Sequence, residues 1–221
     1  MPATPFIVID FETTGMGPAQ GARATEIAAV RVDSGRITGH YQSLMNAGVW
    51  VPPFITALTG ITNQMLAGAP PAAQVMQEVA EFCRGMPLVA HNAAFDRGFW
   101  AAEMAQAGVP ADPAHAAFAC TVLLSRRLYP EAPSHRLGAL ADWLGLQRDG
   151  RAHRALSDAE LTARLLIRLQ RDVTERFADP LGGAEASHAA LCVLQRAPRP
   201  QLARALSRWA QGGQHPAPTA A

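Results

Sequence analysis

The 221-residue sequence contains no lysine, so all 19 of its basic side chains are arginines. They are almost balanced by 18 acidic residues, which leaves a formal net charge of +1. A strongly basic field of the kind that drives tight non-specific nucleic-acid binding is therefore absent. The charge balance disfavours a high-affinity, stand-alone nucleic-acid-binding protein. It fits better a protein that contacts only a few groups of its substrate, or one that a partner delivers to it.

Cysteine and long apolar runs are also scarce. The three cysteines, Cys83, Cys120 and Cys192, are scattered and form no C-x-x-C pair, which supports neither a disulfide framework nor a zinc site. The apolar run near the N-terminus is too short for a signal peptide, and no segment is long enough to span a bilayer. We therefore expect a cytoplasmic protein without a membrane partner.

A pair of acidic residues follows the first apolar segment. Residues 6–9 are short, apolar and largely β-branched, which predicts a buried strand that ends in Asp10-Phe11-Glu12. Alternate strand residues share a face, so Asp10 and Glu12 project together and Phe11 points into packing. Two carboxylates about 4 Å apart repel by roughly 4 kcal/mol at an effective dielectric near 20. A divalent cation between them would remove that cost, although a solvated turn also explains such a pair taken alone.

A further acid follows a second short apolar strand. Residues 87–90 are apolar, His91-Asn92 reads as a turn, and residues 93–107 have helical composition. Asp96 lies in the first turn of this predicted helix. The helix dipole favours a carboxylate there even without a metal. Asp96 by itself is therefore equally compatible with a helix-start acid and with a metal ligand.

The third segment carries His153 and Asp158, which are five residues apart and would face different ways on one continuous helix. The run Ser157-Asp158-Ala159-Glu160 has the form of a capping box, which predicts a helix that starts at Ser157. Asp158 then lies in the first helical turn, and His153 on the loop before it. A fixed carboxylate beside an imidazole suits a metal ligand paired with a general base, because neutral imidazole can accept a proton from water near pH 7.

Over residues 5–172 the sequence resembles the DEDDh exonucleases, a group that includes the proofreading epsilon subunit of bacterial replicative polymerases. The resemblance rests on the four acids and the histidine in this order. It also rests on several further runs, namely Thr13-Thr14-Gly15, Thr25-Glu26-Ile27, ITALTGITNQML at 55–66, AHNAAFD at 90–96, Cys120-Thr121 and Ser134-His135-Arg136-Leu137.

The resemblance implies metal-dependent hydrolysis of phosphodiester bonds at a 3′ end. Its catalytic residues would be Asp10, Glu12, Asp96, His153 and Asp158. Asp10, Glu12 and Asp158 would hold one metal, Asp10 and Asp96 a second, and His153 would act as the base that deprotonates water. Oxygen ligands favour two Mg²⁺ or Mn²⁺ ions over Zn²⁺. The product would be a nucleoside 5′-monophosphate.

The resemblance also implies a set of substrate-binding residues. These are Phe11, Thr13, Thr14, Leu58, His91 and Phe95. In the family, residues equivalent to Thr13 and Thr14 contact the terminal nucleotide partly through the backbone, and Leu58 would form an apolar wedge against the last bases. Leu58 and Phe95 have a simpler alternative as core residues. Many proofreading relatives have a histidine where this chain has Thr59, so a base or sugar contact there is not expected.

The order of elements predicts an α/β fold. Strands are expected at 6–11, 26–33, 37–45, 87–90 and 117–120, with Ser34-Gly35 as a hairpin turn, and helices at 70–84, 93–107, 121–128 and 135–144. Three meandering strands followed by strand–helix alternation predict a mixed five-stranded sheet with helices on both faces, as in the RNase H-like fold. The incomplete G-x-G at Gly15 and Gly17 lacks the rest of a dinucleotide-binding fingerprint.

The predicted domain organisation has three parts. Residues 1–176 form the exonuclease domain, residues 177–211 a helical C-terminal extension, and residues 212–221 a tail that we expect to be disordered. The extension contains Arg196, Arg199, Arg204 and Arg208. It is interpreted as a helical hairpin packed on the domain, with a docking arm for a DNA polymerase subunit as the alternative.

Four functional classes remain open from the sequence. The first is an independent 3′–5′ exonuclease acting on the 3′ end of mainly single-stranded or frayed DNA. The second is a proofreading or accessory subunit bound to a DNA polymerase, and the third is an RNA 3′-trimming exoribonuclease, because no motif reads a 2′-hydroxyl. A non-catalytic binding module is the weakest, since all four acids and the histidine are present.

Overall fold

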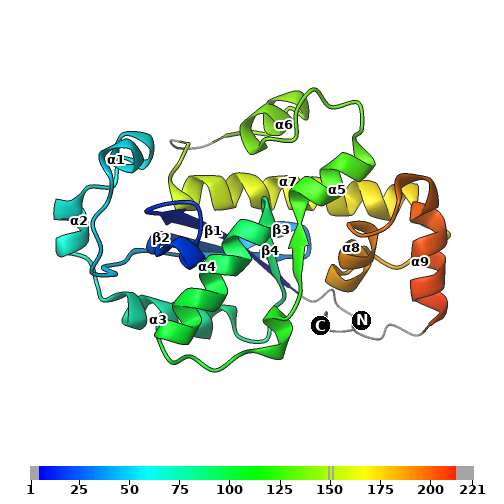
Figure 1. The fold of residues 1–221 in the computed structure, drawn as a ribbon. Coiled ribbons are helices and arrows are strands. Elements are labelled where there is room, and N and C mark those ends of the chain that lie inside the picture. The colour runs from blue at the N-terminus through cyan, green and yellow to red at the C-terminus, as the bar shows by residue number, and fades with distance from the viewer. Residues whose placement is uncertain (1–4, 149, 151, 213–221) are drawn as a thin grey trace.

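A five-stranded mixed sheet forms the centre of the molecule in the computed structural model, which describes residues 5–148, 150 and 152–212 (Figure 1). The strands are β1 (Phe6–Thr13), β2 (Ala24–Asp33), β3 (Arg36–Leu44), β4 (Leu88–Ala90) and β5 (Phe118–Cys120), in the order β3-β2-β1-β4-β5. β1, β2 and β3 pair antiparallel, whereas β4 and β5 join parallel to β1. The predicted mixed sheet is confirmed, with β1 two residues longer than expected.

The hairpin between β2 and β3 follows from its two turn residues. Ser34 and Gly35 both have positive φ, at 49° and 71°. Two consecutive residues of this kind make the turn whose twist matches that of an antiparallel pair. The turn begins the β2–β3 pairing, in which Glu26 lies beside Leu44. In the separate pairing of β1 with β2, Glu26 lies beside Glu12.

Helices cover both faces of the sheet. In the described part of the chain they are α1 (Pro53–Thr59), α2 (Asn63–Ala67), α3 (Ala72–Cys83), α4 (Ala93–Gln106), α5 (Thr121–Leu128), α6 (Leu137–Trp143), α7 (Ala155–Arg176), α8 (His188–Leu194) and α9 (Leu202–Gln211), with short 3₁₀ turns at Pro18–Gln20, Pro113–His115 and Arg199–Gln201. The expected bounds of α5 are confirmed, and those of α3, α4 and α6 differ by one or two residues. The sequence interpretation did not include α1 and α2 as helices.

Alternation along β1 separates two hydrophobic cores. Phe6 and Val8 face the core beneath α7, whereas Ile7, Ile9 and Phe11 face the core beneath α3 and α4. Asp10 and Glu12 continue the Phe6–Val8 series and therefore project toward the α7 face. Both carboxylates thus extend from a strand that is buried at every position except Asp10 and that lies between the two cores.

The beginning of α7 differs from its prediction. The helix starts at Ala155 with Arg154 as its N-cap, and no side chain caps it locally, so the expected start at Ser157 is wrong. The reason is tertiary. The Glu26 carboxylate accepts the Ala155 N–H at 3.1 Å and both Arg154 guanidinium hydrogen bonds at 2.8 and 3.1 Å. A residue from β2 thus satisfies the helix start that a local hydroxyl was expected to serve.

The C-terminal extension packs against the edge of the sheet. The Gln195 side chain accepts the Cys120 N–H at 2.6 Å and donates to the Phe118 carbonyl at 2.9 Å, so its amide pairs with β5 as a neighbouring strand would. His188 lies within 3.0 Å of the Leu88 carbonyl through Nε2. Residues 177–211 thus share the α7-side core.

Except for Gly212, the tail at 212–221 lies outside the described residues. None of the described helices is long and apolar enough to cross a membrane, and the cytoplasmic location stays a prediction.

Candidate active site

The four acids and the histidine come from three separate parts of the fold. Asp10 and Glu12 lie on β1, Asp96 in the first turn of α4, and Asp158 in the first turn of α7. His153 precedes α7 on a loop. Parallel pairing of β4 with β1 brings the start of α4 to the end of β1 that carries the two acids.

Asp96 reaches β1 from the opposite face of the sheet. The Phe11 backbone N–H donates to its Oδ1 atom at 3.2 Å. Asp96 is 2% exposed, so this hydrogen bond compensates only part of the cost of burying its carboxylate. Asn92, the N-cap of α4, adopts positive φ at 68°, which turns the chain sharply from β4 into the helix.

His153 and Asp158 are joined through the backbone. The His153 N–H donates to Asp158 Oδ2 at 2.9 Å, and His153 has positive φ at 60°. Potential ligand atoms of Glu12, His153 and Asp158 all lie within 4.8 Å of one another. The imidazole is therefore close enough to the carboxylates to act on the same water or to bind the same ion. By accepting the His153 N–H, the Asp158 carboxylate fixes the backbone of the loop that places the His153 imidazole near Glu12.

The carboxylates carry more negative charge than their surroundings compensate. Desolvation raises the pKa of Glu12 to about 8, with further contributions from Asp158 and Glu26. Desolvation likewise raises the pKa of Asp96 to about 7. The pKa of Asp10 is raised well above its ordinary value by desolvation and then by Asp96 and Glu12, and desolvation also raises the pKa of Asp158. Clustered, desolvated acids of this kind are typical of functional sites.

The donor set fits hard divalent cations. Carboxylates from β1, α4 and α7 interact here, and among the described residues the cation that lowers the pKa of Glu12 is Arg154, whose guanidinium is already bound to Glu26. A divalent ion would supply the missing positive charge, and oxygen donors are the ligands that Mg²⁺ and Mn²⁺ prefer. The residues present therefore fit the metals that the family resemblance implies.

Glu26 and Arg154 form a supporting pair whose role the sequence interpretation missed. Glu26 is fully buried, and it also accepts a hydrogen bond from Gln42 at 2.7 Å. Burial by itself would raise the pKa of Glu26. The hydrogen bonds that it accepts from Arg154, Gln42 and the Ala155 N–H outweigh this effect and hold the pKa below its ordinary value. The available signal was an acid next to the apolar run Ile27-Ala28-Ala29-Val30 in a buried strand, which predicts a buried partner of opposite charge.

The predicted substrate-binding residues occupy different environments. Leu58 is exposed on α1, whereas the Phe11 side chain is buried, so only the backbone of Phe11 could contact a substrate. Phe95 is partly buried with its ring centroid 4.9 Å from that of Phe99. His91 bonds Thr121 through Nδ1 at 2.8 Å, and its buried Nε2 has no partner among the described residues.

Thr13, Thr14 and Thr59 have structural hydrogen bonds. The Thr13 hydroxyl donates to the Gly15 carbonyl at 2.7 Å, and the Thr14 hydroxyl accepts the Arg23 N–H at 3.0 Å. The buried Thr59 hydroxyl donates to the Ile55 carbonyl and accepts the Ile61 N–H. Thr59 therefore closes the end of α1. The substrate contacts of Thr13 and Thr14 stay predictions.

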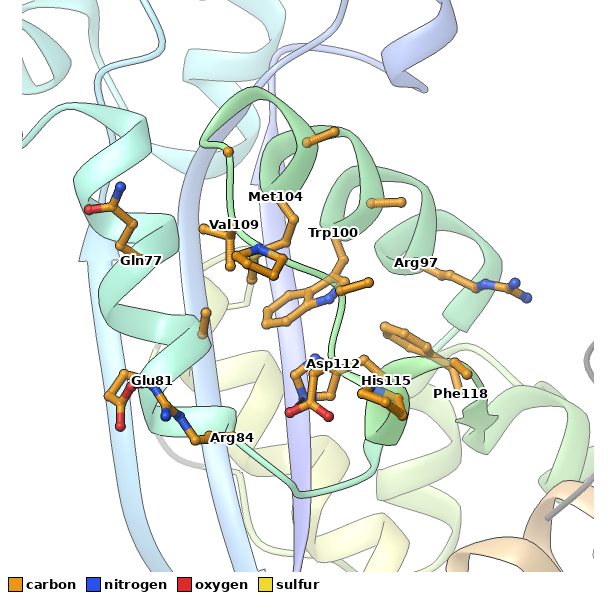
Figure 2. Close-up of a pocket in the computed structure, with 18 residues that line it drawn as sticks. Gln77, Glu81, Arg84, Arg97, Trp100, Met104, Val109, Asp112, His115 and Phe118 are labelled. Carbon is orange, nitrogen blue, oxygen red and sulfur yellow. Dashed lines mark hydrogen bonds and ion pairs between the residues drawn. The ribbon is translucent and has the colours of Figure 1, made fainter.

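A cavity of about 980 Å³ lies elsewhere, between α3, α4 and the segment 108–116 (Figure 2). Trp100, Met104 and Val109 contribute apolar surface, and Arg97 lies at one side of it (Figure 2). The four acids and His153 are not among its lining residues. The carboxylates at the strand ends and this cavity are therefore separate features of the described structure.

Comparison with known proteins agrees with the geometry. A family model described as Exonuclease (RNase_T) matches residues 7–166. The chain is 38% identical over 164 residues to the 3′-5′ exonuclease DinG of Bacillus subtilis (strain 168), a match that covers 74% of this chain and 17% of DinG. It is 39% identical over 173 residues to a PolC-type DNA polymerase III of Streptococcus thermophilus (strain ATCC BAA-491 / LMD-9), covering 77% of this chain and 11% of the polymerase. The chain thus spans less than a fifth of the length of these relatives.

Solved structures share the fold. Exonuclease X in complex with 5′-overhanging duplex DNA matches with a TM-score of 0.62 and 28% identity, over 85% of this chain and 99% of that one. E. coli exonuclease I in complex with a dT13 oligonucleotide matches with a TM-score of 0.67 and 20% identity, over 80% of this chain and 43% of that one. The nuclease domain of 3′hExo, a DEDDh family member bound to rAMP, matches with a TM-score of 0.66 and 21% identity, over 77% and 93%.

Proposed function

Because the chain belongs to the DEDDh family of 3′–5′ exonucleases, we propose that it removes nucleoside 5′-monophosphates one at a time from the 3′ end of DNA. The observation that carries this proposal is the grouping of Glu12, His153 and Asp158 within metal-ligand distance. Asp10 interacts electrostatically with Asp96, Glu12 and Asp158 beside them. Single-stranded or frayed ends are the proposed substrate, because a near-neutral chain lacks the field that grips long duplexes.

The carboxylates divide into two groups in the proposed mechanism. Asp10, Glu12 and Asp158 would hold one divalent ion, and Asp10 with Asp96 a second. When bound, Mg²⁺ or Mn²⁺ would supply the positive charge that stabilises the displacement at phosphorus. Asp10 belongs to both groups, and its desolvation beside Asp96 and Glu12 is the electrostatic reason that the pair of ions is favoured there.

His153 is the proposed general base. Its imidazole would accept a proton from the attacking water, whose oxygen forms the new bond to phosphorus as the bond to the leaving 3′ oxygen breaks. The leaving oxygen takes up a proton and becomes the new 3′-hydroxyl. Asp158 positions this base, because it accepts the His153 N–H and thereby shapes the backbone that precedes α7.

Digestion of matched oligonucleotides tests the proposal. Single-stranded DNA, mismatched duplex DNA and RNA are each incubated with Mg²⁺, Mn²⁺ or EDTA, for the wild type and Asp10→Asn. We expect metal-dependent release of 5′-mononucleotides from DNA and its loss in the variant. Undiminished activity in EDTA or in Asp10→Asn would refute the mechanism, and faster release from RNA would make the enzyme an exoribonuclease.

A second candidate role is proofreading for a DNA polymerase, favoured by the match to part of a PolC-type polymerase III. The C-terminal extension packs on β5, so its removal would expose the sheet edge and is an unsuitable test. Arg204 and Arg208 are exposed on α9 and can be changed without unfolding the domain. Co-purification of a polymerase with the wild type but not with Arg204→Glu/Arg208→Glu would support docking through the extension. Identical partner sets would contradict it.

A further inference from the structure

Three exposed apolar side chains follow one another at helical spacing before and along α1. Trp50 is 72% exposed, Phe54 is 68% exposed and Leu58 is 47% exposed. Phe54 and Leu58 are one turn apart on α1, while Ile55 and Thr59 face inward. We call Trp50, Phe54 and Leu58 the apolar ridge. Such a run of exposed large side chains on a small domain indicates a binding surface.

The apolar ridge is held outward by a well-ordered frame. Val51, next to Trp50, is 1% exposed, and the Asn63 side chain bonds both its N–H, at 2.8 Å, and its carbonyl, at 3.1 Å. Val51 is thus directed inward with its N–H and carbonyl both bonded to Asn63, while the neighbouring Trp50 side chain lies at the surface. The ridge is therefore presented to solvent by a preformed structure, which reduces the entropy lost on binding.

The frame sits at the same end of the sheet as the catalytic acids. Leu44, the last residue of β3, packs against the cluster of Val51, Ile55, Ile61 and Leu66 that supports α1 and α2. In the sheet register Leu44 pairs with Glu26, and Glu26 pairs with Glu12. Adjacent strands lie about 4.8 Å apart, so Leu44, which contacts the cluster supporting α1, lies two strands away from Glu12 in the sheet. Figure 1 shows α1 on the same side of the molecule as the first turn of α7.

The segment that carries the ridge is free of formal charge. Residues 37–77 contain no aspartate, glutamate, lysine or arginine. The segment therefore has no cation to pair with phosphates and no carboxylate to repel them. A nucleic-acid strand beside it would be recognised through its bases. On α1, Phe54 and Leu58 are about one helical pitch of 5.4 Å apart, less than the roughly 6.8 Å that a base stacked between two side chains requires, so bases would stack on the outer faces of the ridge side chains.

We propose that Trp50, Phe54 and Leu58 together form a stacking platform for unpaired bases upstream of the terminal nucleotide, and so select single-stranded 3′ ends. The proposal rests on the exonuclease function proposed above. It assigns Trp50 and Phe54 to substrate specificity and leaves the chemistry to the acids and His153. Aromatic faces stack on every base, so the platform discriminates strandedness more than sequence.

The test compares substrates with and without upstream bases. Wild type, Trp50→Ala, Phe54→Ala and the double variant are assayed on a single-stranded oligothymidylate and on the p-nitrophenyl ester of thymidine 5′-monophosphate, which has no upstream base. Because stacking contributes roughly five- to hundredfold per base, we expect KM for the oligonucleotide to rise about tenfold or more in the double variant, with kcat/KM for the ester changed less than about twofold. Phe54→Tyr, which retains the aromatic face, is expected to restore the oligonucleotide KM.

Two further measurements isolate the bases. Abasic nucleotides next to the 3′ terminus should raise the KM of the wild type to about the KM that the double variant has for the intact oligonucleotide. In the double variant, the same abasic nucleotides should leave KM unchanged. The ratio of variant to wild-type KM should not change between about 50 and about 200 mM salt, because the ridge has no charged group to release counterions. Additive losses or a strongly salt-dependent ratio would contradict base stacking.

Several outcomes would overturn the platform. Unchanged oligonucleotide KM in the double variant would do so directly, and loss of a co-purifying protein with unchanged KM would make the ridge a protein-binding surface. A wild type that hydrolyses neither substrate would refute the exonuclease function and not the ridge. The ridge would then be judged by fluorescence anisotropy of labelled oligothymidylate with Ca²⁺, where equal affinity of wild type and double variant would also refute stacking.

Discussion

Replacing Glu12 with glutamine is expected to stabilise the metal-free protein while abolishing its activity. Glu12 is 9% exposed, and desolvation together with Asp158 and Glu26 raises its pKa from 4.5 to about 8. Between these two pH values the folded state binds more protons than the unfolded state, so its stability falls as pH rises. Glutamine does not titrate. The advantage of the variant should therefore be absent near pH 4, grow above pH 4.5 and level off above pH 8.

The magnitude follows from the same two pKa values. Each pH unit between 4.5 and 7 costs about 1.4 kcal/mol, so the carboxyl of Glu12 destabilises the metal-free fold by up to about 3 kcal/mol at pH 7. For a protein of this size that corresponds to roughly 6–12 °C in melting temperature. The glutamine amide also loses hydration on burial, so we expect an increase near the lower end of this range.

Differential scanning calorimetry in EDTA at several pH values is the assay. Glu103→Gln is the matched control, because this buried glutamate is bonded to Arg23 at 2.9 Å and to the Ala24 N–H at 3.0 Å. Glu103→Gln should lower the melting temperature, whereas Glu12→Gln should raise it. Mn²⁺ should then stabilise the wild type more than Glu12→Gln, since ligand binding to the folded state adds stability. A variant less stable than wild type in EDTA at pH 8, or a difference independent of pH, would refute this reasoning.

Three other changes test the support of the site. Glu26→Gln should destabilise the fold by about 2–4 kcal/mol in chemical denaturation, because it leaves Arg154 without its buried charged partner. It should also lower kcat, because the start of α7 would shift. Equal stability of variant and wild type would contradict this prediction. His153→Ala should lose about a hundredfold or more in kcat with Mn²⁺ affinity largely retained in calorimetry, as general-base catalysis predicts, and lost affinity would make the imidazole a ligand instead. Gly150→Ala should reduce turnover without abolishing folding, because Gly150 has φ of 78° and an added Cβ would collide with the Ser157 hydroxyl; wild-type kcat would show that this loop adapts freely.

The local geometry of the site was predictable because it depends on neighbouring residues. Strand alternation alone places Asp10 and Glu12 on one face and Phe11 in the core, and the structure has them so. The same holds for the first-turn positions of Asp96 and Asp158. These predictions succeeded because backbone repeats of two and 3.6 residues decide the direction of each side chain without reference to distant segments.

The prediction of the α7 start failed for the opposite reason. The S-x-x-E run at Ser157 is a valid local signal, yet Glu26, 129 residues before Ala155, already satisfies the backbone two residues earlier. A buried carboxylate that already accepts two hydrogen bonds from Arg154 is a stronger acceptor for the Ala155 N–H than a solvated hydroxyl. Likewise, Asn63 bonds the Val51 backbone beside the exposed Trp50, and that contact between residues twelve positions apart is not visible in the spacing of apolar residues.

The sequence by itself determined which acids this protein has, which strand or helix turn carries each, and that such oxygen-rich side chains would suit divalent cations. Only the tertiary structure decided how those groups are held and what surrounds them. It pairs Glu26 with Arg154 across the fold, joins Gln195 to the edge of β5 and turns the apolar ridge toward solvent at the end of the sheet that carries Glu12. The division has one physical cause. Side-chain direction follows from short-range backbone geometry, whereas burial, desolvation and long-range pairing depend on which distant segments fold together.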